Sequence, residues 1–226
     1  MKDKIVVITG GAKGLGVVMA QLLIAKGNKV IICSRTKSEV ERVAAEINAT
    51  PFVADVSKEE DIVALKDFAV STFGTLDVWI NNAGIWSPKG VVEDTDINLW
   101  RQMFDINVFG TMYGSKAALL QMRRQNIGIL VNIISSSALT AKPTFAGYAA
   151  TKWAVRGFTD SIREEYRNTP IKIISVYPGG IKTNFFGGDA LIDTSSYMTA
   201  EFVAHKIIEN LEQEKPLEEL VIRRAE

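Results

Sequence analysis

Tyr148 and Lys152 are two residues whose types and spacing suit proton transfer. They stand four positions apart in a segment with helical periodicity, 145–167, so both side chains lie on one face of the predicted helix. A phenol stays protonated up to a pH near ~10, and a neighbouring ammonium group lowers its pKa. We expect Lys152 to bring the pKa of Tyr148 to about 7–9, with the positive nicotinamide of an oxidised cofactor adding to the shift. In this range the phenol can donate a proton to a carbonyl oxygen or accept one from an alcohol.

Ser135 and Asn107 stand where they could support the same chemistry. Ser135 follows the predicted strand 129–134, and a hydroxyl at the carboxyl end of a parallel strand faces the ligand crevice. Asn107 is a polar amide on the apolar stripe of a predicted helix over 97–124, and a buried amide needs hydrogen-bond partners. Asn107 either contributes to the active site or caps a local distortion of the helix backbone.

A glycine-rich turn follows the first predicted strand, 5–8, and opens a predicted helix over 15–26. Its spacing is Gly10-x-x-x-Gly14-x-Gly16. Glycines in such a turn let the backbone approach a pyrophosphate, which the amides at the helix N-terminus then bind. The spacing differs from G-x-G-x-x-G and from the P-loop. We interpret the turn as a dinucleotide site, the alternative being a turn that only packs the helix on the strand.

The residues after the second predicted strand, 30–33, bear on the choice of dinucleotide. An NAD-binding fold usually has an acidic side chain here for the adenosine ribose, whereas this chain has none before Glu39. Arg35 and Lys13 could instead bind the 2′-phosphate of NADP, because a guanidinium fork suits a dianion. The alternative is that both are solvated loop cations. We predict that NADP(H) is preferred over NAD(H).

The elements that must position these residues are visible in the hydrophobic pattern. Runs rich in Val and Ile occur at 5–8, 30–33, 52–54, 78–80, 129–134, 171–176 and 220–222. Segments with helical periodicity occur at 15–26, 38–47, 58–72, 97–124, 145–167 and 199–213. Continuous apolar strands alternating with helices are typical of a parallel sheet covered on both faces. We therefore predict an α/β fold, a doubly wound Rossmann-type sheet of seven parallel strands in a single domain over 1–226, with a substrate lid around 179–197.

Composition excludes several classes of protein. Lys and Arg number 26, as do Asp and Glu, and this balance argues against binding to nucleic acid or to an anionic membrane. One cysteine, Cys33, and one histidine, His205, leave no intrachain disulfide, no Cys/His zinc site and no metal cluster of that kind. No apolar stretch reaches the ~20 residues of a membrane span, and the N-terminal one is too short for a signal peptide. We expect a cytoplasmic protein.

Together these motifs resemble the compact branch of the short-chain dehydrogenase/reductase family, over nearly the whole chain. The matching motifs are Thr9-Gly10-x-x-x-Gly14-x-Gly16, Asp55-Val56, Asn81-Asn82-Ala83-Gly84, Asn107, Ser135, Tyr148-x-x-x-Lys152 and Pro178-Gly179-x-x-x-Thr183. The resemblance implies that Tyr148 is the acid/base and that Ser135 polarises the substrate carbonyl. Lys152 would lower the pKa of Tyr148 and bind the nicotinamide ribose, and Asn107 would hold a water that links Lys152 to a proton relay.

The resemblance also implies a cofactor site. Its residues would be Gly10, Lys13, Gly14, Leu15, Gly16, Ser34, Arg35, Asp55, Val56, Asn82, Ala83, Gly84, Tyr148, Lys152, Pro178, Gly179, Ile181 and Thr183. Asp55 and Val56 would contact adenine, and Ile181 and Thr183 would hold the carboxamide end. The cofactor then carries the hydride chemistry, while the protein supplies position and electrostatics.

The expected assembly is a homodimer. The predicted helix 145–167 carries a stripe of mainly small residues: Ala146, Ala150, Trp153, Ala154 and Gly157. Such a stripe suits close packing between subunits, with burial against the protein's own sheet as the alternative. The chain ends soon after its last predicted strand, without the glycine-containing tail of many tetrameric relatives, so a dimer through the helices bearing Asn107 and Tyr148 is favoured.

The expected reaction is hydride transfer between nicotinamide and a small-molecule carbonyl or secondary alcohol. A non-catalytic NADP-binding redox sensor or regulator is the alternative, although such proteins usually lose the tyrosine or the lysine that this chain keeps. Four apolar residues near the motifs predict an apolar substrate pocket. The alternative is that they pack the lid closed. These residues are Trp86, Leu139, Phe185 and Phe186. Lys142 could bind a phosphate or carboxylate group, so an acidic substrate is a further alternative.

Overall fold

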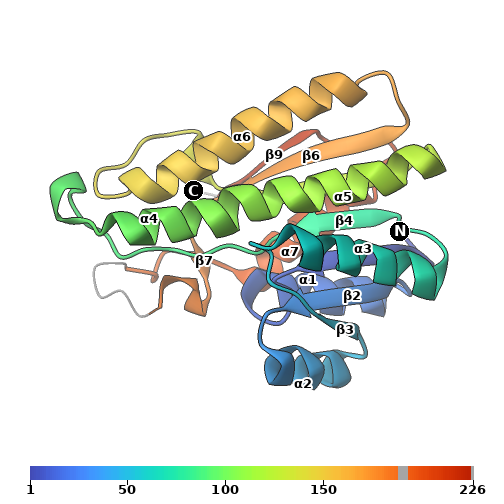
Figure 1. The fold of residues 1–226 in the computed structure, drawn as a ribbon. Coiled ribbons are helices and arrows are strands. Elements are labelled where there is room, and N and C mark those ends of the chain that lie inside the picture. Colours follow the sequence, from blue (N-terminus) through green and yellow to red (C-terminus); the bar gives the residue numbers. More distant parts are fainter. Residues whose placement is uncertain (188–192, 225–226) are drawn as a thin grey trace.

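The computed structural model describes residues 1–187 and 193–224, and it contains a seven-stranded parallel sheet in the order β3-β2-β1-β4-β5-β6-β9 (Figure 1). Its strands are β1 (Ile5–Thr9), β2 (Lys29–Ser34), β3 (Thr50–Val53), β4 (Val78–Asn81), β5 (Gly128–Ile133), β6 (Ile171–Pro178) and β9 (Glu219–Ile222). Every neighbouring pair in this sheet is parallel. The predicted seven-stranded, doubly wound parallel sheet is confirmed.

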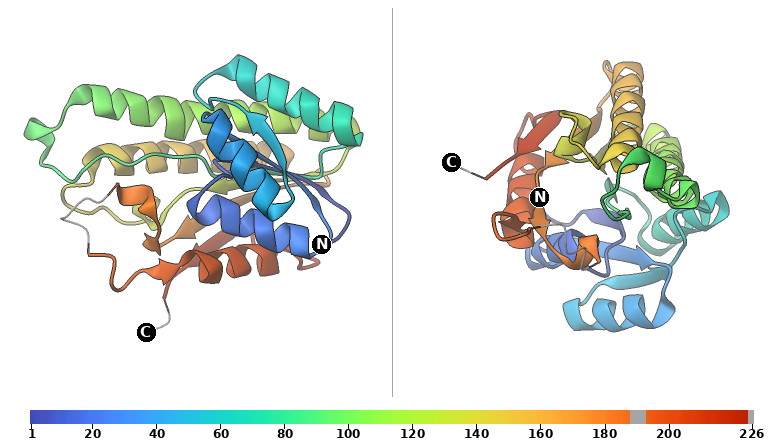
Figure 2. Two further views of the ribbon diagram at one scale, coloured as in Figure 1. Left: turned by 90° about the horizontal axis from the view of Figure 1, so that it is seen from below. Right: turned by 90° about the vertical axis from the view of Figure 1, so that its left-hand side faces the viewer.

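Helices cover both faces of the sheet (Figures 1 and 2). On one face lie α1 (Gly14–Ala25), α2 (Lys37–Ile47) and α7 (Ala200–Leu211), and on the other lie α3 (Glu59–Phe73), α5 (Gly110–Gln125) and α6 (Ala146–Tyr166). Alternate residues of β1 point to opposite faces: Val6 and Ile8 pack in the core under α1, and Val7 packs in the core under α3. Burial on both faces explains why the strand is apolar throughout.

The strand order reverses between β1 and β4, and the glycine turn and the β4 loop meet there. The hydroxyl of Thr9, the last residue of β1, accepts hydrogen bonds from the backbone amides of Asn82 at 3.0 Å and Ala83 at 3.1 Å. In return, Asn82 Nδ2 donates to the carbonyls of Thr9 and Gly10, at 2.9 and 3.1 Å. These bonds fix the two loops to each other at the point where an open α/β sheet binds its ligand.

The helix expected over 97–124 is present, but it is not α-helical throughout. It begins as α4 (Ile97–Met103), passes through a π-helical segment, η2 (Phe104–Phe109), and continues as α5. Asn107 lies in the π-helical segment, and its side chain hydrogen-bonds with both the N–H and the C=O of Ile85. The distortion that the sequence left open as an alternative for Asn107 is therefore present, and it directs the amide at the loop after β4.

The segment predicted as a lid and the two residues after it contain three short elements that the hydrophobic pattern did not indicate. β7 (Ile181–Lys182) pairs with β8 (Met198–Thr199) in a separate two-stranded sheet, and a 3₁₀ turn, η4 (Asn184–Phe186), lies between them. Two further 3₁₀ turns, η1 (Val92–Asp94) and η3 (Ser136–Ala138), follow β4 and β5. Residues 188–192 of the predicted lid lie outside the described residues.

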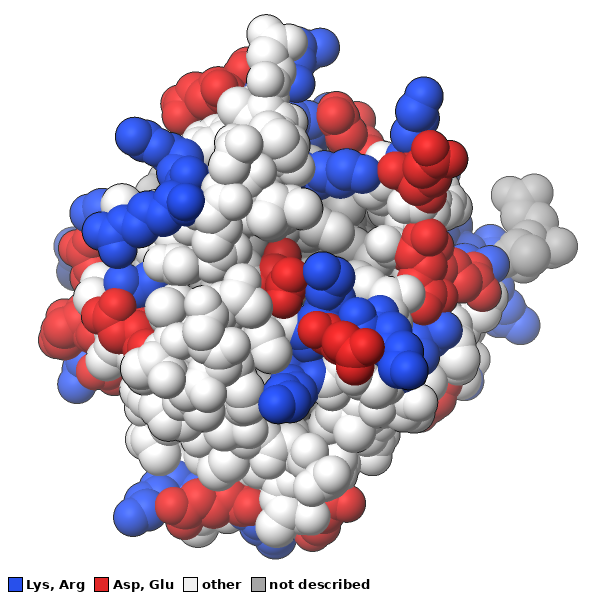
Figure 3. All heavy atoms as spheres, turned by 90° about the vertical axis from the view of Figure 1, so that its right-hand side faces the viewer, with Lys and Arg blue, Asp and Glu red and all other residues white. Residues whose placement is uncertain are grey.

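On the face of the molecule drawn in Figure 3, Lys and Arg side chains lie among Asp and Glu side chains. This mixture accords with the equal numbers of the two kinds in the sequence. Within residues 1–187 and 193–224, no helix combines the length and the apolar character that crossing a membrane requires.

A buried polar network holds β4 against β5 and α5. Asn81 Oδ1 accepts from Trp79 Nε1 at 2.7 Å, and Asn81 Nδ2 donates to Asn132 Oδ1 at 2.8 Å. A Cβ at Gly114 of α5 would lie 2.1 Å from Asn81 Oδ1 and 2.8 Å from Trp79 Nε1. The close approach of α5 to the strand that leads into Asn82 therefore requires glycine at this position.

We expect Gly114→Ala to destabilise the protein by about 2–3 kcal/mol, because the methyl group must displace a fully hydrogen-bonded buried amide. Urea unfolding followed by circular dichroism measures the change. A variant as stable as the natural chain would contradict the role assigned to this network.

Candidate active site

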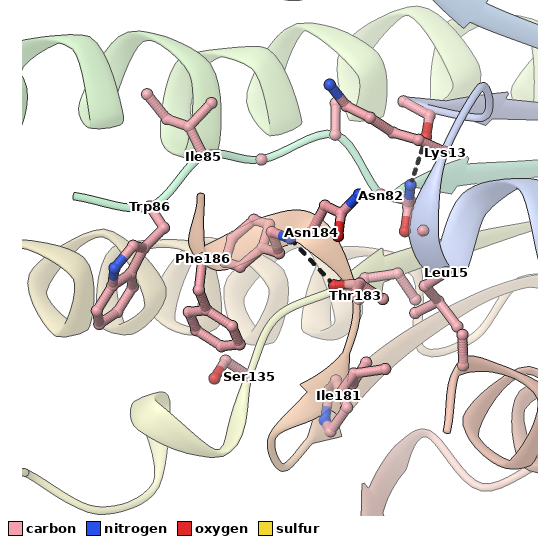
Figure 4. Close-up of a pocket in the computed structure, with 18 of the residues that line it drawn as sticks. Lys13, Leu15, Asn82, Ile85, Trp86, Ser135, Ile181, Thr183, Asn184 and Phe186 are labelled. Carbon is pink, nitrogen blue, oxygen red and sulfur yellow. Dashed lines mark hydrogen bonds between the residues drawn. The ribbon is translucent and has the colours of Figure 1, made fainter. Parts of the chain in front are cut away.

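A cavity of about 670 Å³ opens at the carboxyl ends of the strands (Figure 4). It extends from Arg35 and Asp55 at one end to Trp86 and Phe186 at the other. The predicted site residues that line it are Gly10, Lys13, Gly14, Leu15, Ser34, Arg35, Asp55, Val56, Asn82, Ala83, Gly84, Ser135, Tyr148, Lys152, Pro178, Gly179, Ile181 and Thr183. The structure thus brings together eighteen of the predicted residues, whereas Gly16 and Asn107 do not line the cavity.

The glycine turn forms one wall. Gly10 and Gly14 have φ values of +62° and +54°, in the left-handed region that favours glycine. A Cβ at Gly16 would lie 2.4 Å from the carbonyl oxygen of Gly10. Glycine is therefore required at position 16 for α1 to pack on the turn, and the residue itself does not line the cavity. The N-cap residue of α1, Lys13, makes no side-chain capping bond, so the first amides of the helix are not capped by that side chain and suit an anion.

Ser135, Tyr148 and Lys152 converge at the middle of the cavity. The hydroxyl of Ser135 lies near enough to the phenol of Tyr148 to lower its pKa. It also accepts a hydrogen bond from the amide of Ser137 at 3.1 Å, as the N-cap of the 3₁₀ turn η3. The Nζ atom of Lys152 is 5.5 Å from the centroid of the Tyr148 ring and donates to the carbonyl of Ile133 at 3.4 Å. A carbonyl oxygen placed beside Ser135 and Tyr148 would meet two hydroxyl groups at once.

The protonation of these groups differs from the expectation. Burial raises the pKa of Tyr148 to about 12, against a smaller lowering by the nearby hydroxyl of Ser135. Burial also lowers the pKa of Lys152 to about 8. The expectation that Lys152 brings the pKa of Tyr148 to about 7–9 was wrong for the protein's own groups, because the ammonium lies beside the ring and is itself destabilised by burial.

Asn107 supports the loop that carries the cofactor motif. Its Oδ1 accepts from the amide of Ile85 at 2.8 Å, and its Nδ2 donates to the carbonyl of Ile85 at 3.0 Å and to Thr151 Oγ1 at 3.3 Å. A Cβ at Gly84 would lie 3.3 Å from Asn107 Oδ1 and 3.9 Å from Lys152 Nζ. The side chain therefore orients the backbone beside Lys152, and its part in a water relay stays a prediction.

The far end of the cavity carries both signs of charge. Arg35 lies close enough to Asp55 to favour its ionised form. Burial raises the pKa of Asp55, but the hydrogen bonds from the hydroxyl and amide of Ser57, together with the positive charges of Arg35 and Lys58, outweigh burial. The pKa of Asp55 therefore lies below its ordinary value. Glu39 also lines this end, a residue that the prediction of the site did not include.

The opposite end is walled by aromatic rings. Trp86 contacts Phe145, Tyr148 and Phe186, with ring centroids 4.8, 4.9 and 5.4 Å apart. Phe185 and Tyr197 extend this wall. The sequence indicated Trp86, Phe185 and Phe186. It gave no signal for Phe145 and Tyr197, which join the wall only through the tertiary fold. Leu139, the fourth residue indicated, packs instead with Val108 and Val155.

The fold and this site define a nicotinamide-dependent dehydrogenase/reductase, and comparison with known proteins agrees. The family model described as short chain dehydrogenase matches residues 4–190. A protein of Staphylococcus aureus (strain MRSA252) described as an uncharacterized oxidoreductase is 37% identical over 187 residues, which cover 81% of this chain and 80% of that protein. The trans-4-hydroxycyclohexanecarboxylate dehydrogenase of Sinomonas cyclohexanicum is 37% identical over 197 residues, with 82% and 75% coverage.

Solved structures show the same architecture. The ElxO protein with NADP bound superimposes with a TM-score of 0.89 at 32% identity, over 98% of this chain and 97% of that one. Levodione reductase gives a TM-score of 0.90 at 26% identity, over 98% and 96%. The chain belongs to the short-chain dehydrogenase/reductase family, and it is an NAD(P)-dependent oxidoreductase.

The raised pKa of Tyr148 is open to direct measurement. We expect an ultraviolet difference titration between the protein and its Tyr148→Phe variant to show no phenolate belonging to Tyr148 below about pH 11, because burial favours the neutral phenol. The variant Tyr166→Phe, at the other end of α6, controls for the general effect of removing a tyrosine hydroxyl from the same helix. A titration step centred between about pH 7 and 9 that only Tyr148→Phe removes would contradict this assignment and support a phenol governed by Lys152.

Proposed function

We propose that this chain is an NADP(H)-dependent oxidoreductase that transfers a hydride between nicotinamide and a carbonyl or secondary alcohol, with Tyr148 as the acid/base. The observation that carries the proposal is the convergence of Ser135, Tyr148 and Lys152 in the same cavity as the glycine turn, with Lys152 Nζ 5.5 Å from the centroid of the Tyr148 ring. The uncapped N-terminus of α1 and the glycines that line the cavity suit a pyrophosphate, so the residues fit the cofactor.

In this mechanism the cofactor supplies the hydride that the carbonyl carbon accepts. Ser135 donates a hydrogen bond to the carbonyl oxygen and orients it, and Tyr148 donates its proton to the same oxygen as the negative charge develops. The pKa of about 12 keeps Tyr148 protonated for this step. In the oxidative direction Tyr148 must accept the proton, which the positive charges of Lys152 and of an oxidised nicotinamide favour.

The preference for NADP(H) rests on Arg35 and Lys13, which both line the cavity. A guanidinium fork is suited to a 2′-phosphate, and Lys13 adds a second positive charge. The NADP bound in the structure of ElxO, a relative at 32% identity, supports this choice.

The proposed substrate is a ketone or secondary alcohol that carries a ring. The aromatic wall around Trp86 offers edge and face contacts to a cyclic carbon skeleton. A relative named for trans-4-hydroxycyclohexanecarboxylate, a cyclic secondary alcohol, supports this choice. Turnover of small open-chain ketones with no turnover across a panel of cyclic ketones would contradict it.

We also propose a cytoplasmic homodimer of single-domain subunits, with the segment 179–197 as the substrate lid. The stripe on α6 faces away from the sheet: Ala146, Ala150, Trp153 and Gly157 are exposed. On the neighbouring helix Leu120 is exposed as well, as is Phe109 just before it. Two exposed apolar patches on adjacent helices support an interface there. A monomer in sedimentation equilibrium would contradict the dimer.

Tyr148→Phe is the test of the mechanism. We expect the variant to lose turnover by at least about a thousandfold, because the proton donor is gone, while the dissociation constant for NADPH changes by less than about threefold. Steady-state kinetics on a cyclic ketone and fluorescence titration measure the two quantities, with Tyr166→Phe as the control. Turnover at the rate of the natural chain would exclude Tyr148 as the acid/base.

Arg35→Ala is the test of the cofactor preference. We expect this variant to bind NADPH about ten- to a hundredfold more weakly and NADH almost unchanged, because the lost charge-assisted bonds are made only to the phosphate. Arg42→Ala is the matched control, since Arg42 is an exposed residue of α2 paired with Glu46. Equal losses for the two cofactors would show that Arg35 does not recognise the 2′ position.

A further inference from the structure

Glu39 lines the cavity together with Arg35 and Asp55, and its side chain does not make the contact that its local sequence pattern predicts. Thr36-Lys37-Ser38-Glu39 has the spacing of a capping box, in which the glutamate accepts a hydrogen bond from the backbone N–H of the N-cap residue. Thr36 is the N-cap of α2 and makes no side-chain cap bond, and its N–H is directed to Ser34 Oγ at 3.4 Å. The capping box is not formed.

The Glu39 carboxylate is bonded to the end of β2 instead. Ser34 Oγ donates to Glu39 Oε2 at 3.2 Å, and both residues line the cavity together with Arg35. Within residues 1–187 and 193–224, no lysine or arginine forms an ion pair with Glu39. Its position in the first turn of α2 stabilises the negative charge through the helix dipole.

The two carboxylates at this end of the cavity are not equivalent. Asp55 Oδ1 already accepts hydrogen bonds from the amide and the hydroxyl of Ser57, at 3.0 and 2.7 Å. Glu39 accepts only the bond from Ser34, through Oε2, among its contacts with the described residues. Glu39 therefore has acceptor capacity left for a ligand, in a position four residues after Arg35.

We propose that Glu39 is a specificity-determining residue that opposes Arg35 at the 2′ position of the adenosine ribose, so that the enzyme uses both NADP(H) and NAD(H). Arg35 attracts a 2′-phosphate, whereas a carboxylate repels that dianion and accepts a hydrogen bond from a free 2′-hydroxyl. Preference for NADP(H) then depends on the difference between two opposed side chains. This inference rests on the proposed function, because it needs a nicotinamide dinucleotide in this cavity.

The test is a binding titration of the full chain with NADPH and, separately, with NADH. Energy transfer from tryptophan to the reduced nicotinamide reports binding without turnover, and Trp86 lines the cavity. We expect Glu39→Gln to bind NADPH about three- to tenfold more tightly, because a repulsive charge is removed, and NADH about three- to tenfold more weakly, because a charged acceptor is lost. The ratio of the two dissociation constants then shifts by at least about tenfold.

Glu41→Gln is the matched control. Glu41 is an exposed residue of the same helix, 3.8 Å from Lys37, and its substitution removes the same charge away from the cavity. We expect it to change neither constant by more than about twofold. A ratio in Glu39→Gln within about twofold of the natural chain, or an equal shift in both variants, would overturn the proposal for Glu39 alone. Failure of the natural chain to bind either cofactor would overturn the proposed function and this inference together.

Discussion

The reversal of strand order between β1 and β4 is the constraint on which the site depends. After β1 the chain adds β2 and β3 on one side of that strand, and from β4 onward it adds strands on the other side. The loops after β1 and β4 therefore diverge, and a crevice opens between them. The hydroxyl of Thr9 closes the base of that crevice by accepting bonds from the amides of Asn82 and Ala83. Without a side-chain acceptor there, two partly buried amides after the end of β4 would lose their partner.

The common direction of the strands brings the functional residues together at one edge of the sheet. All seven strands run parallel, so the residues that follow them meet at the same side, whatever their separation in sequence. Ser135 follows β5, and Tyr148 and Lys152 lie in the first two turns of α6, which packs over that same end. The dinucleotide motif at β1 and the proton donor thus share one cavity, with the charged end at Arg35 and the aromatic end at Trp86.

Much of the fold and of the site could be predicted, because local sequence patterns determine it. Continuous Val and Ile runs identify buried parallel strands, and the Gly10-x-x-x-Gly14-x-Gly16 turn identifies a close backbone approach. Tertiary contacts determine the rest. The π-helical segment at Asn107 depends on bonds to Ile85, far along the chain, and the β7–β8 pair needs two segments to meet before either is a strand. The pKa of Tyr148 depends on burial, which spacing does not show. The position of Glu39 beside Ser34 could not be predicted either, because the spacing from Thr36 to Glu39 fits a capping box that the fold does not form.

The central claim is that one cavity holds a dinucleotide from Arg35 to Tyr148. An X-ray structure of the protein crystallised with NADP⁺ tests it most directly, because it needs no knowledge of the substrate. The account predicts the adenosine phosphate beside Arg35, the pyrophosphate at the N-terminus of α1 and the nicotinamide ring beside Tyr148 and Ser135. A cofactor bound elsewhere, or one whose nicotinamide lies away from Tyr148, would contradict it.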